Sequence, residues 1–284
     1  MKVLIGFWRF VLVLLIILGI IAVLGLLFPF CKRKGKARWI RRLSRWALGV
    51  LGIRFTMKGV VPDERALDGR IPDGPGYLVC ANHVSFADIF VLDAVLPCRF
   101  VAKKEIAGWP VFGWISKGVD TLFIDRQNRR AVLEIGNLMR EAVEEGTNVL
   151  FFPEGTTSSG ERLRPFYANL FQVAASSGAP VLPVCLRYTQ NGKLSTVASY
   201  TDNTPLFTVI KRIVFNRGLG VEVTVLPPID SKGKDRHQIS SEAARMMSRE
   251  LGVEDETALK EKARLERLQS LASKAASEEG RRPI

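Results

Sequence analysis

His83 and Asp88 are the two residues of this sequence whose types and spacing could do acid–base chemistry. They lie in the stretch 82–88, Asn-His-Val-Ser-Phe-Ala-Asp, between two apolar runs. Five positions place two side chains about 140° apart on a helix and on opposite faces of a strand, so no single regular element joins them. A strand that ends near Asn82 and a helix that starts near Ser85 would bring them together. Asp88 could then hold one tautomer of His83, whose other ring nitrogen would accept a proton from a hydroxyl group.

The same stretch has a structural interpretation. Ser85 and Asp88 have the spacing of a capping box, with Ser85 at the N-cap and Asp88 at N3, which would leave His83 as an ordinary loop residue. The stretch by itself leaves both interpretations open.

Three further stretches place polar residues directly after strand-like apolar runs. They supply Lys103 and Lys104, then Arg126, then Glu154 with Gly155 and Thr156. Each charge alone could be an ordinary surface or turn residue. In a parallel sheet, however, the carboxyl ends of the strands share one edge, where open α/β sheets bind ligands. The clustering therefore favours a site that combines a base, carboxylates and cations able to hold a phosphate.

The pattern beyond residue 59 alternates short apolar runs with helical periodicity. Strands are expected near 77–82, 99–103, 121–125, 148–152, 180–187 and 221–226, and helices near 86–96, 128–145, 167–177, 205–216 and 236–251. Such alternation predicts an α/β fold with a mainly parallel central sheet flanked by helices.

The N-terminus predicts membrane attachment. Residues 10–31 carry no charge over 22 positions, a length of about 33 Å as a helix, which matches the hydrocarbon core of a bilayer. The run is too long for a signal-peptide core and lacks a small-x-small cleavage site. Eight basic residues follow within 32–45 and only two precede the run. This asymmetry predicts a retained anchor, either spanning or re-entrant at Pro29, with the remaining chain in the cytoplasm.

The segment after the anchor is expected to be a basic amphipathic helix. Its apolar side includes Trp39, Leu43 and Trp46, and its arginines occupy the opposite side. We interpret it as an interfacial helix among anionic headgroups; the alternative is a helix packed on the soluble domain.

The charge distribution and the cysteine spacing argue against nucleic-acid and metal partners. Residues 1–60 hold 12 basic and no acidic residues, whereas the other 224 residues hold 29 basic and 28 acidic. The net charge of +13 thus belongs to the N-terminus, and no nucleic-acid partner is expected. The four cysteines have neither zinc-site nor disulfide spacing, so we expect no metal.

We divide the chain into a membrane module (1–58), an α/β domain (59–253) and a charged C-terminal helix and tail (254–284).

Four blocks together resemble the glycerolipid acyltransferase family, which includes 1-acyl-glycerol-3-phosphate acyltransferases. They are Asn-His-x-x-x-x-Asp, the lysine-to-Ile-Asp-Arg segment, Phe-Pro-Glu-Gly-Thr and the Val-Leu-Pro-Val strand, within residues 77–190. The resemblance implies that His83 and Asp88 form the catalytic pair. It also implies that Arg126, Glu154 and Gly155 bind the acceptor. The N-terminal module is similar to the membrane-docking module of bacterial members, which implies an inner-membrane location.

The expected reaction is acyl transfer to the sn-2 hydroxyl of 1-acyl-glycerol-3-phosphate, giving phosphatidic acid for phospholipid synthesis. The donor would be acyl-coenzyme A or acyl carrier protein, and no cofactor is expected. Direct transfer to the hydroxyl is favoured, because the sequence lacks a Gly-x-Ser-x-Gly elbow that would supply a serine nucleophile. Arg126 with Lys103 or Lys104 would hold the phosphate, and Glu154 would contact a glycerol hydroxyl or orient Arg126. Two alternatives stay open: another acceptor, such as a lyso-ornithine lipid or glycerol 3-phosphate, or a membrane-docked lipid-binding protein without catalysis.

Overall fold

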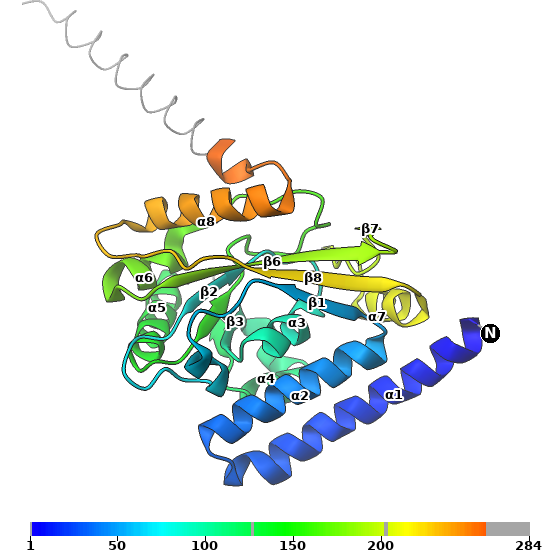
Figure 1. Cartoon of the computed structure of the whole chain (residues 1–284). Coiled ribbons are helices and arrows are strands. Elements are labelled where there is room, and N and C mark those ends of the chain that lie inside the picture. The colour runs from blue at the N-terminus through cyan, green and yellow to red at the C-terminus, as the bar shows by residue number, and fades with distance from the viewer. Residues whose placement is uncertain (1, 126–127, 202–203, 260–284) are drawn as a thin grey trace, which may run out of the picture.

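An eight-stranded sheet forms the centre of the chain in a computed structural model that describes residues 2–125, 128–201 and 204–259 (Figure 1). The strands are β1 (Arg54–Lys58), β2 (Leu78–Ala81), β3 (Arg99–Lys103), β4 (Leu122–Ile124), β5 (Val149–Phe151), β6 (Val181–Gln190), β7 (Lys193–Leu194) and β8 (Leu219–Val225). Their order is β1-β8-β6-β2-β5-β3-β4, with β7 on β6. The strands from β6 to β4 run parallel, and β8 pairs antiparallel with β6.

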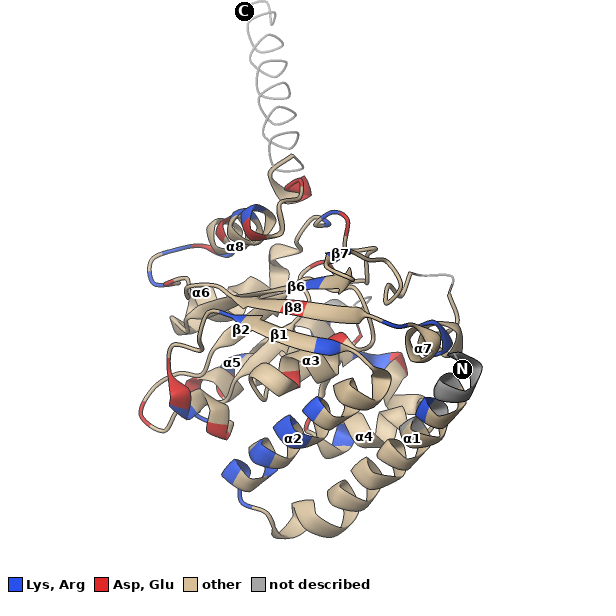
Figure 2. Ribbon diagram, turned by 45° about the vertical axis from the view of Figure 1, so that its right-hand side comes forward, with Lys and Arg blue, Asp and Glu red and all other residues tan. Residues whose placement is uncertain are grey.

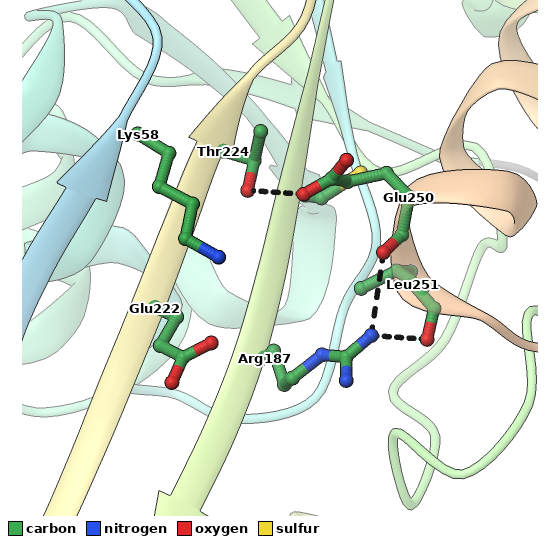
Figure 3. A pocket seen from close by; sticks show the side chains of 7 residues that line it. Lys58, Arg187, Glu222, Thr224, Glu250 and Leu251 are labelled. Carbon is green, nitrogen blue, oxygen red and sulfur yellow. Dashed lines mark hydrogen bonds between the residues drawn. The ribbon is translucent and has the colours of Figure 1, made fainter. Parts of the chain in front are cut away.

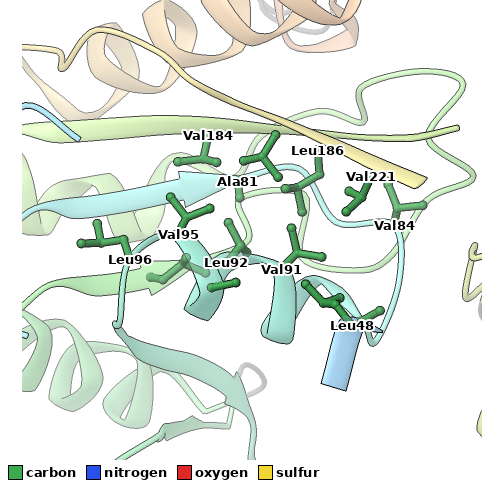
Figure 4. Close-up of a cluster of buried hydrophobic side chains, with 14 of the residues drawn as sticks. Leu48, Ala81, Val84, Val91, Leu92, Val95, Leu96, Val184, Leu186 and Val221 are labelled. Atoms are coloured by element: carbon green, nitrogen blue, oxygen red, sulfur yellow. The ribbon is translucent and has the colours of Figure 1, made fainter. Parts of the chain in front are cut away.

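Helices cover both faces of this sheet. They are α1 (Lys2–Ala22), α2 (Arg33–Leu51), α3 (Asp88–Val95), α4 (Phe112–Gly118), α5 (Arg129–Glu144), α6 (Gln172–Ser177), α7 (Leu206–Phe215) and α8 (Arg236–Leu251). The central strands β2 and β5 are buried on both sides, and successive residues alternate between the faces. Val79 and Ala81 of β2 thus join α2, α3 and α7 in one core (Figure 4), whereas Leu78 and Cys80 join α5, α6 and α8 in the other.

The predicted fold class is confirmed, and each of the six expected strands is present. The sequence pattern missed three elements: the edge strand β1, the short β7 and helix α4. β1 is mostly exposed and therefore lacks an apolar alternation. α4 has glycine at its second and last positions, which lowers helix propensity. The expected helix 167–177 begins as a 3₁₀ turn (Ala168–Phe171) before α6. Of the helix expected from Asp255 onward, residues 255–259 are described, and 256–259 are helical.

The N-terminal apolar run continues α1 through a π-helical turn (Val23–Leu27) and a 3₁₀ turn (Phe28–Phe30). Among the described residues, Phe7–Phe30 is the one helical stretch long and apolar enough to cross a membrane. Its buried residues recur at every fourth position: Ile16, Ile20, Leu24 and Phe28. They pack against residues of α2, α3 and α4. One side of the predicted anchor therefore lies on the rest of the protein.

Helix α2 forms as expected, but protein covers much of its apolar side. Leu48 and Leu51 join the core beneath the sheet, and Trp39 and Leu43 pack beside α1. Trp46 stays 48% exposed, and basic positions recur along the helix (Figure 2). The interfacial role of this helix remains a prediction, and any bilayer contact would involve Trp46 and the arginines.

Candidate active site

His83 and Asp88 meet across the turn that joins β2 to α3. The Nδ1 atom of His83 lies 2.8 Å from Oδ2 of Asp88. The imidazole is stacked on the Phe152 ring, with centroids 3.8 Å apart and 11° between the planes. Asp88 is fully buried, while the His83 side chain is 21% exposed. With its proton on Nδ1, the imidazole carries its electron pair on Nε2, so the arrangement provides an oriented general base.

Asp88 is held by four hydrogen-bond donors. Its Oδ2 atom accepts from His83 Nδ1 and also from the backbone N–H groups of Val84 (2.7 Å) and Ser85 (2.9 Å). Its Oδ1 atom accepts from the hydroxyl of Tyr188 on β6, at 2.7 Å. A buried carboxylate needs such donors to stay charged. Tyr188, which the sequence analysis did not single out, is thus a direct partner of the pair.

The capping-box interpretation accounts for only part of this geometry. α3 begins at Asp88, and its N-cap, Ala87, makes no side-chain capping bond. The Asp88 side chain does accept the Ser85 N–H, as a residue at N3 would. The same oxygen also accepts from His83. Asp88 therefore caps the start of α3 and orients the imidazole at the same time.

Glu154 is buried and accepts hydrogen bonds from the backbone near His83. Its Oε1 atom accepts the N–H of His83 at 2.7 Å, and its Oε2 atom accepts the N–H of Arg164 at 3.1 Å. The residue is 2% exposed, and burial raises the pKa of its carboxyl group to about 7. The sequence suggested a contact with the acceptor or with Arg126. In the described structure, both oxygens accept hydrogen bonds from backbone groups, and a contact with the acceptor stays a prediction.

The other predicted residues differ in their surroundings. Lys103 lines the cavity described below, while Lys104 forms an exposed ion pair with Asp125 (Nζ to Oδ2, 3.8 Å). Gly155 has the left-handed φ of 73° that glycine tolerates, and with Thr156 it also lines the cavity. Arg126 lies outside the described residues.

An apolar cavity of about 610 Å³ adjoins His83. Its polar wall comes from loops at the carboxyl edge of the sheet and includes His83, Lys103, Thr156, Thr157 and Tyr200. Its apolar wall comes from helices and includes Ile16, Ile20, Leu24, Leu43, Ala47, Phe112, Ile115 and Ile210. The volume lies within the usual range for small-ligand sites. α1 and α2 thus form part of a binding cavity as well as carrying the predicted membrane contacts.

A second, smaller cavity of about 130 Å³ lies over β1, β8 and β6 beside the end of α8 (Figure 3). Two of its four charged residues, Arg187 and Glu250, form hydrogen bonds in its wall. Arg187 donates to the carbonyl oxygens of Glu250 and Leu251, and Thr224 donates to the Glu250 carboxylate at 2.9 Å. A cation at the last carbonyls of a helix stabilises its C-terminus, so we assign Arg187 a structural role.

His83 thus lies at the carboxyl edge of an α/β sheet, beside an apolar cavity, where such folds bind ligands. Residues 66–187 match the family model described as Acyltransferase. A 1-acyl-sn-glycerol-3-phosphate acyltransferase from Neisseria meningitidis is 43% identical, over 70% of this chain and 88% of that protein. A lyso-ornithine lipid O-acyltransferase from Pseudomonas aeruginosa is 35% identical, over 72% of this chain and 76% of that protein.

The fold is also that of a solved acyltransferase. The crystal structure of the 1-acyl-sn-glycerophosphate acyltransferase PlsC from Thermotoga maritima superposes with a TM-score of 0.59. It covers 86% of this chain and 96% of the solved one, at 20% identity. The chain belongs to the acyltransferase family that contains the 1-acyl-sn-glycerol-3-phosphate acyltransferases, and it is an O-acyltransferase.

Replacing Tyr188 with Phe tests the hydrogen bond to Asp88. The change removes one of the four hydrogen bonds that hold the Asp88 carboxylate in place. We expect kcat to fall by less than about tenfold, because one hydrogen bond contributes roughly 1 kcal/mol, and KM to change little. Tyr77→Phe, at the buried position directly before β2, is the control. An unchanged kcat in the Tyr188 variant would contradict the role.

The buried carboxyl of Glu154 predicts a pH-dependent stability. Its pKa rises from 4.5 to about 7 on folding, so the folded chain binds this proton more tightly than the unfolded chain. The stabilisation is complete below pH 4.5 and is lost as the pH rises through about 7. We expect the free energy of unfolding, relative to Glu154→Gln, to fall by roughly 3 kcal/mol across this window.

Urea unfolding in detergent micelles, followed by tryptophan fluorescence at several pH values, measures this difference. Glu134→Gln, at an exposed position of α5, should run parallel to the wild type. A Glu154→Gln curve that also ran parallel would show that the buried carboxyl does not couple to folding.

Proposed function

We propose that this enzyme transfers an acyl chain from an acyl thioester to the sn-2 hydroxyl of 1-acyl-glycerol-3-phosphate and releases phosphatidic acid. The observation that carries the proposal is the His83 imidazole, held by Asp88 through Nδ1 at 2.8 Å, in the wall of an apolar cavity. The similarity to acyltransferases named for this acceptor supports the choice of substrate.

In the proposed reaction, Nε2 of His83 removes the proton from the acceptor hydroxyl while that oxygen attacks the thioester carbonyl. Asp88 stabilises the imidazolium that forms. Collapse of the tetrahedral intermediate breaks the carbon–sulfur bond, and the imidazolium returns its proton to the departing thiolate. No covalent acyl-enzyme is needed, because the hydroxyl itself is the nucleophile.

The acceptor phosphate would lie near Lys103, the described cation of the cavity wall. Arg126 and Lys104 would be further phosphate ligands, and Gly155 and Thr156 would contact the glycerol backbone. Glu154 would act as a positioning residue for His83 through the 2.7 Å bond to its backbone. A phosphate fixed in this way would decide which hydroxyl reaches Nε2.

The acyl chain would occupy the apolar part of the cavity, between α1, α2 and α4. Burial of its methylene groups among Ile16, Leu43 and Ile115 would provide most of the binding free energy. The donor would be acyl-coenzyme A or acyl carrier protein.

We also propose that α1 lies in the membrane plane, on the cytoplasmic face of a bacterial inner membrane. Arg9, near its start, donates hydrogen bonds to backbone oxygens of Val214 and Asn216 (3.2 and 2.8 Å). Leu24, past its end, packs beside α4. A helix with both ends on one domain does not need to cross the bilayer.

Protease access to an N-terminal tag in spheroplasts and in inverted vesicles tests the topology. Cleavage only from the cytoplasmic side is expected, and periplasmic cleavage would show a spanning helix.

The acceptor is tested with purified protein in vesicles of phosphatidylethanolamine and phosphatidylglycerol. Lysophosphatidate, lyso-ornithine lipid and glycerol 3-phosphate are offered separately, with labelled acyl-coenzyme A or acyl carrier protein. We expect the highest kcat/KM for lysophosphatidate. The second candidate is a lyso-ornithine lipid, because an acyltransferase named for that acceptor is 35% identical. Faster transfer to it would replace our proposal.

A further inference from the structure

Helix α7 exposes an aromatic and basic stripe that the proposed reaction does not use. Phe207, Lys211 and Phe215 follow one another at every fourth position and share one side of the helix. Phe207 is 62% exposed and Phe215 is 38% exposed. The opposite side, with Val209 and Ile213, is buried in the core beneath the sheet. We define Phe207, Lys211 and Phe215 as the α7 stripe.

This stripe lies beside the apolar helix of the N-terminus. α7 and the first turns of α1 are neighbours (Figure 1), and Arg9 of α1 binds the carbonyl oxygens of Val214 and Asn216 at the end of α7. In the same region α1 exposes Phe7 (57%) and Trp8 (59%). The end of the stripe at Phe215 therefore lies near the exposed apolar residues of α1.

The charged residues on the segment that carries the stripe are all basic. Residues 204–221 contain Lys211, Arg212 and Arg217 and no aspartate or glutamate. A basic side chain between aromatic rings suits the interface of an anionic bilayer, where the rings enter the headgroup region and the ammonium group remains at the phosphates. Charge and proximity to α1 both point to a lipid surface.

We propose that α7 is a second membrane-contact element, which docks the α/β domain on the bilayer beside α1. The inference rests on the proposed action on membrane lipids. The same helix lines the cavity with Leu206 and Ile210, so docking α7 would bring this side of the cavity to the plane in which lysolipids diffuse. The lysolipid would then enter from the bilayer without crossing water.

The double variant Phe207→Ser/Phe215→Ser of the full chain tests the proposal. Sedimentation with vesicles of phosphatidylethanolamine and phosphatidylglycerol (3:1) measures binding, and we expect the partition coefficient to fall at least about tenfold. The matched control is Leu133→Ser/Leu138→Ser on α5. These residues are 70% and 45% exposed, and α5 covers the other face of the sheet. The control should bind as the wild type does.

Activity gives the second readout. Transfer to lysolipid in detergent micelles should stay within about twofold of the wild type, while transfer to lysolipid in vesicles should fall with the binding. Unchanged vesicle binding, or an equal loss in the α5 control, would overturn the proposal. So would intact vesicle binding with lost transfer from acyl carrier protein, which would assign the stripe to a protein partner. A wild type inactive in both assays would refute the proposed function, and the binding data would still decide the role of α7.

Discussion

Replacing His83 with Ala is expected to reduce acyl transfer by about 10²–10⁴-fold, the usual contribution of a general base. The acceptor hydroxyl would lose the group that takes its proton, while the cavity and the Asp88 hydrogen bonds to Val84 and Ser85 would persist. We therefore expect kcat to carry the loss, with little change in KM. Initial rates with labelled donor and lysophosphatidate in vesicles measure both constants.

The chain offers a matched control, because it contains one other histidine. His237 lies on α8, and its neighbour Arg236 donates to its ring at 3.3 Å. His237→Ala should transfer acyl chains at the wild-type rate. Retention of most of the turnover in His83→Ala would remove the base from the mechanism.

The second large effect is expected for Asp88→Asn, with a decrease in kcat of up to about 10⁴-fold. The amide oxygen can take the place of Oδ2 and accept from Val84, Ser85 and His83. The amide nitrogen would then face the Tyr188 hydroxyl, which can rotate to accept. The turn is thus preserved, but the negative charge that stabilises the imidazolium is removed.

The choice of asparagine matters for this test. Alanine would leave the N–H groups of Val84 and Ser85 without the buried acceptor that they now share, at a cost of several kcal/mol to folding. Asp235→Asn, at the N-cap of α8, is the control for a change from carboxylate to amide. If a folded Asp88→Asn protein turned over at the wild-type rate, Asp88 would have only the capping role and no role in catalysis.

The sequence pattern predicts the central strands well because they are buried on both faces and form continuous apolar runs. It also predicts that His83, Lys103 and Glu154 lie at one sheet edge, and this follows from the parallel order of β2, β5 and β3. β1 could not be found in this way, because four of its five residues are exposed.

Two details of the site depend on contacts between distant segments. Tyr188 reaches Asp88 across 100 positions. The available signal was its place on the buried face of β6, in alternation with Val184 and Leu186, where a hydroxyl requires a partner. Glu154 has no comparable signal, because a carboxylate after a strand can face a ligand, solvent or the backbone. Only the folded loops bring it to the N–H groups of His83 and Arg164.

Helix α1 has one side in the cavity wall and another side exposed, so a change in this helix can affect both the cavity and the proposed membrane contact. Ile16, Ile20 and Leu24 line the cavity, while Leu14, Leu15 and Leu18 of the same helix are exposed. If α1 lies in the membrane and the acyl chain in this cavity, as we propose, a substitution that shifts the helix in the bilayer would also change the room available to the acyl chain. Deleting the helix to obtain a water-soluble enzyme would open the same cavity to solvent. Adaptation to a new lipid environment and a change of chain-length preference should therefore tend to arise together in this lineage.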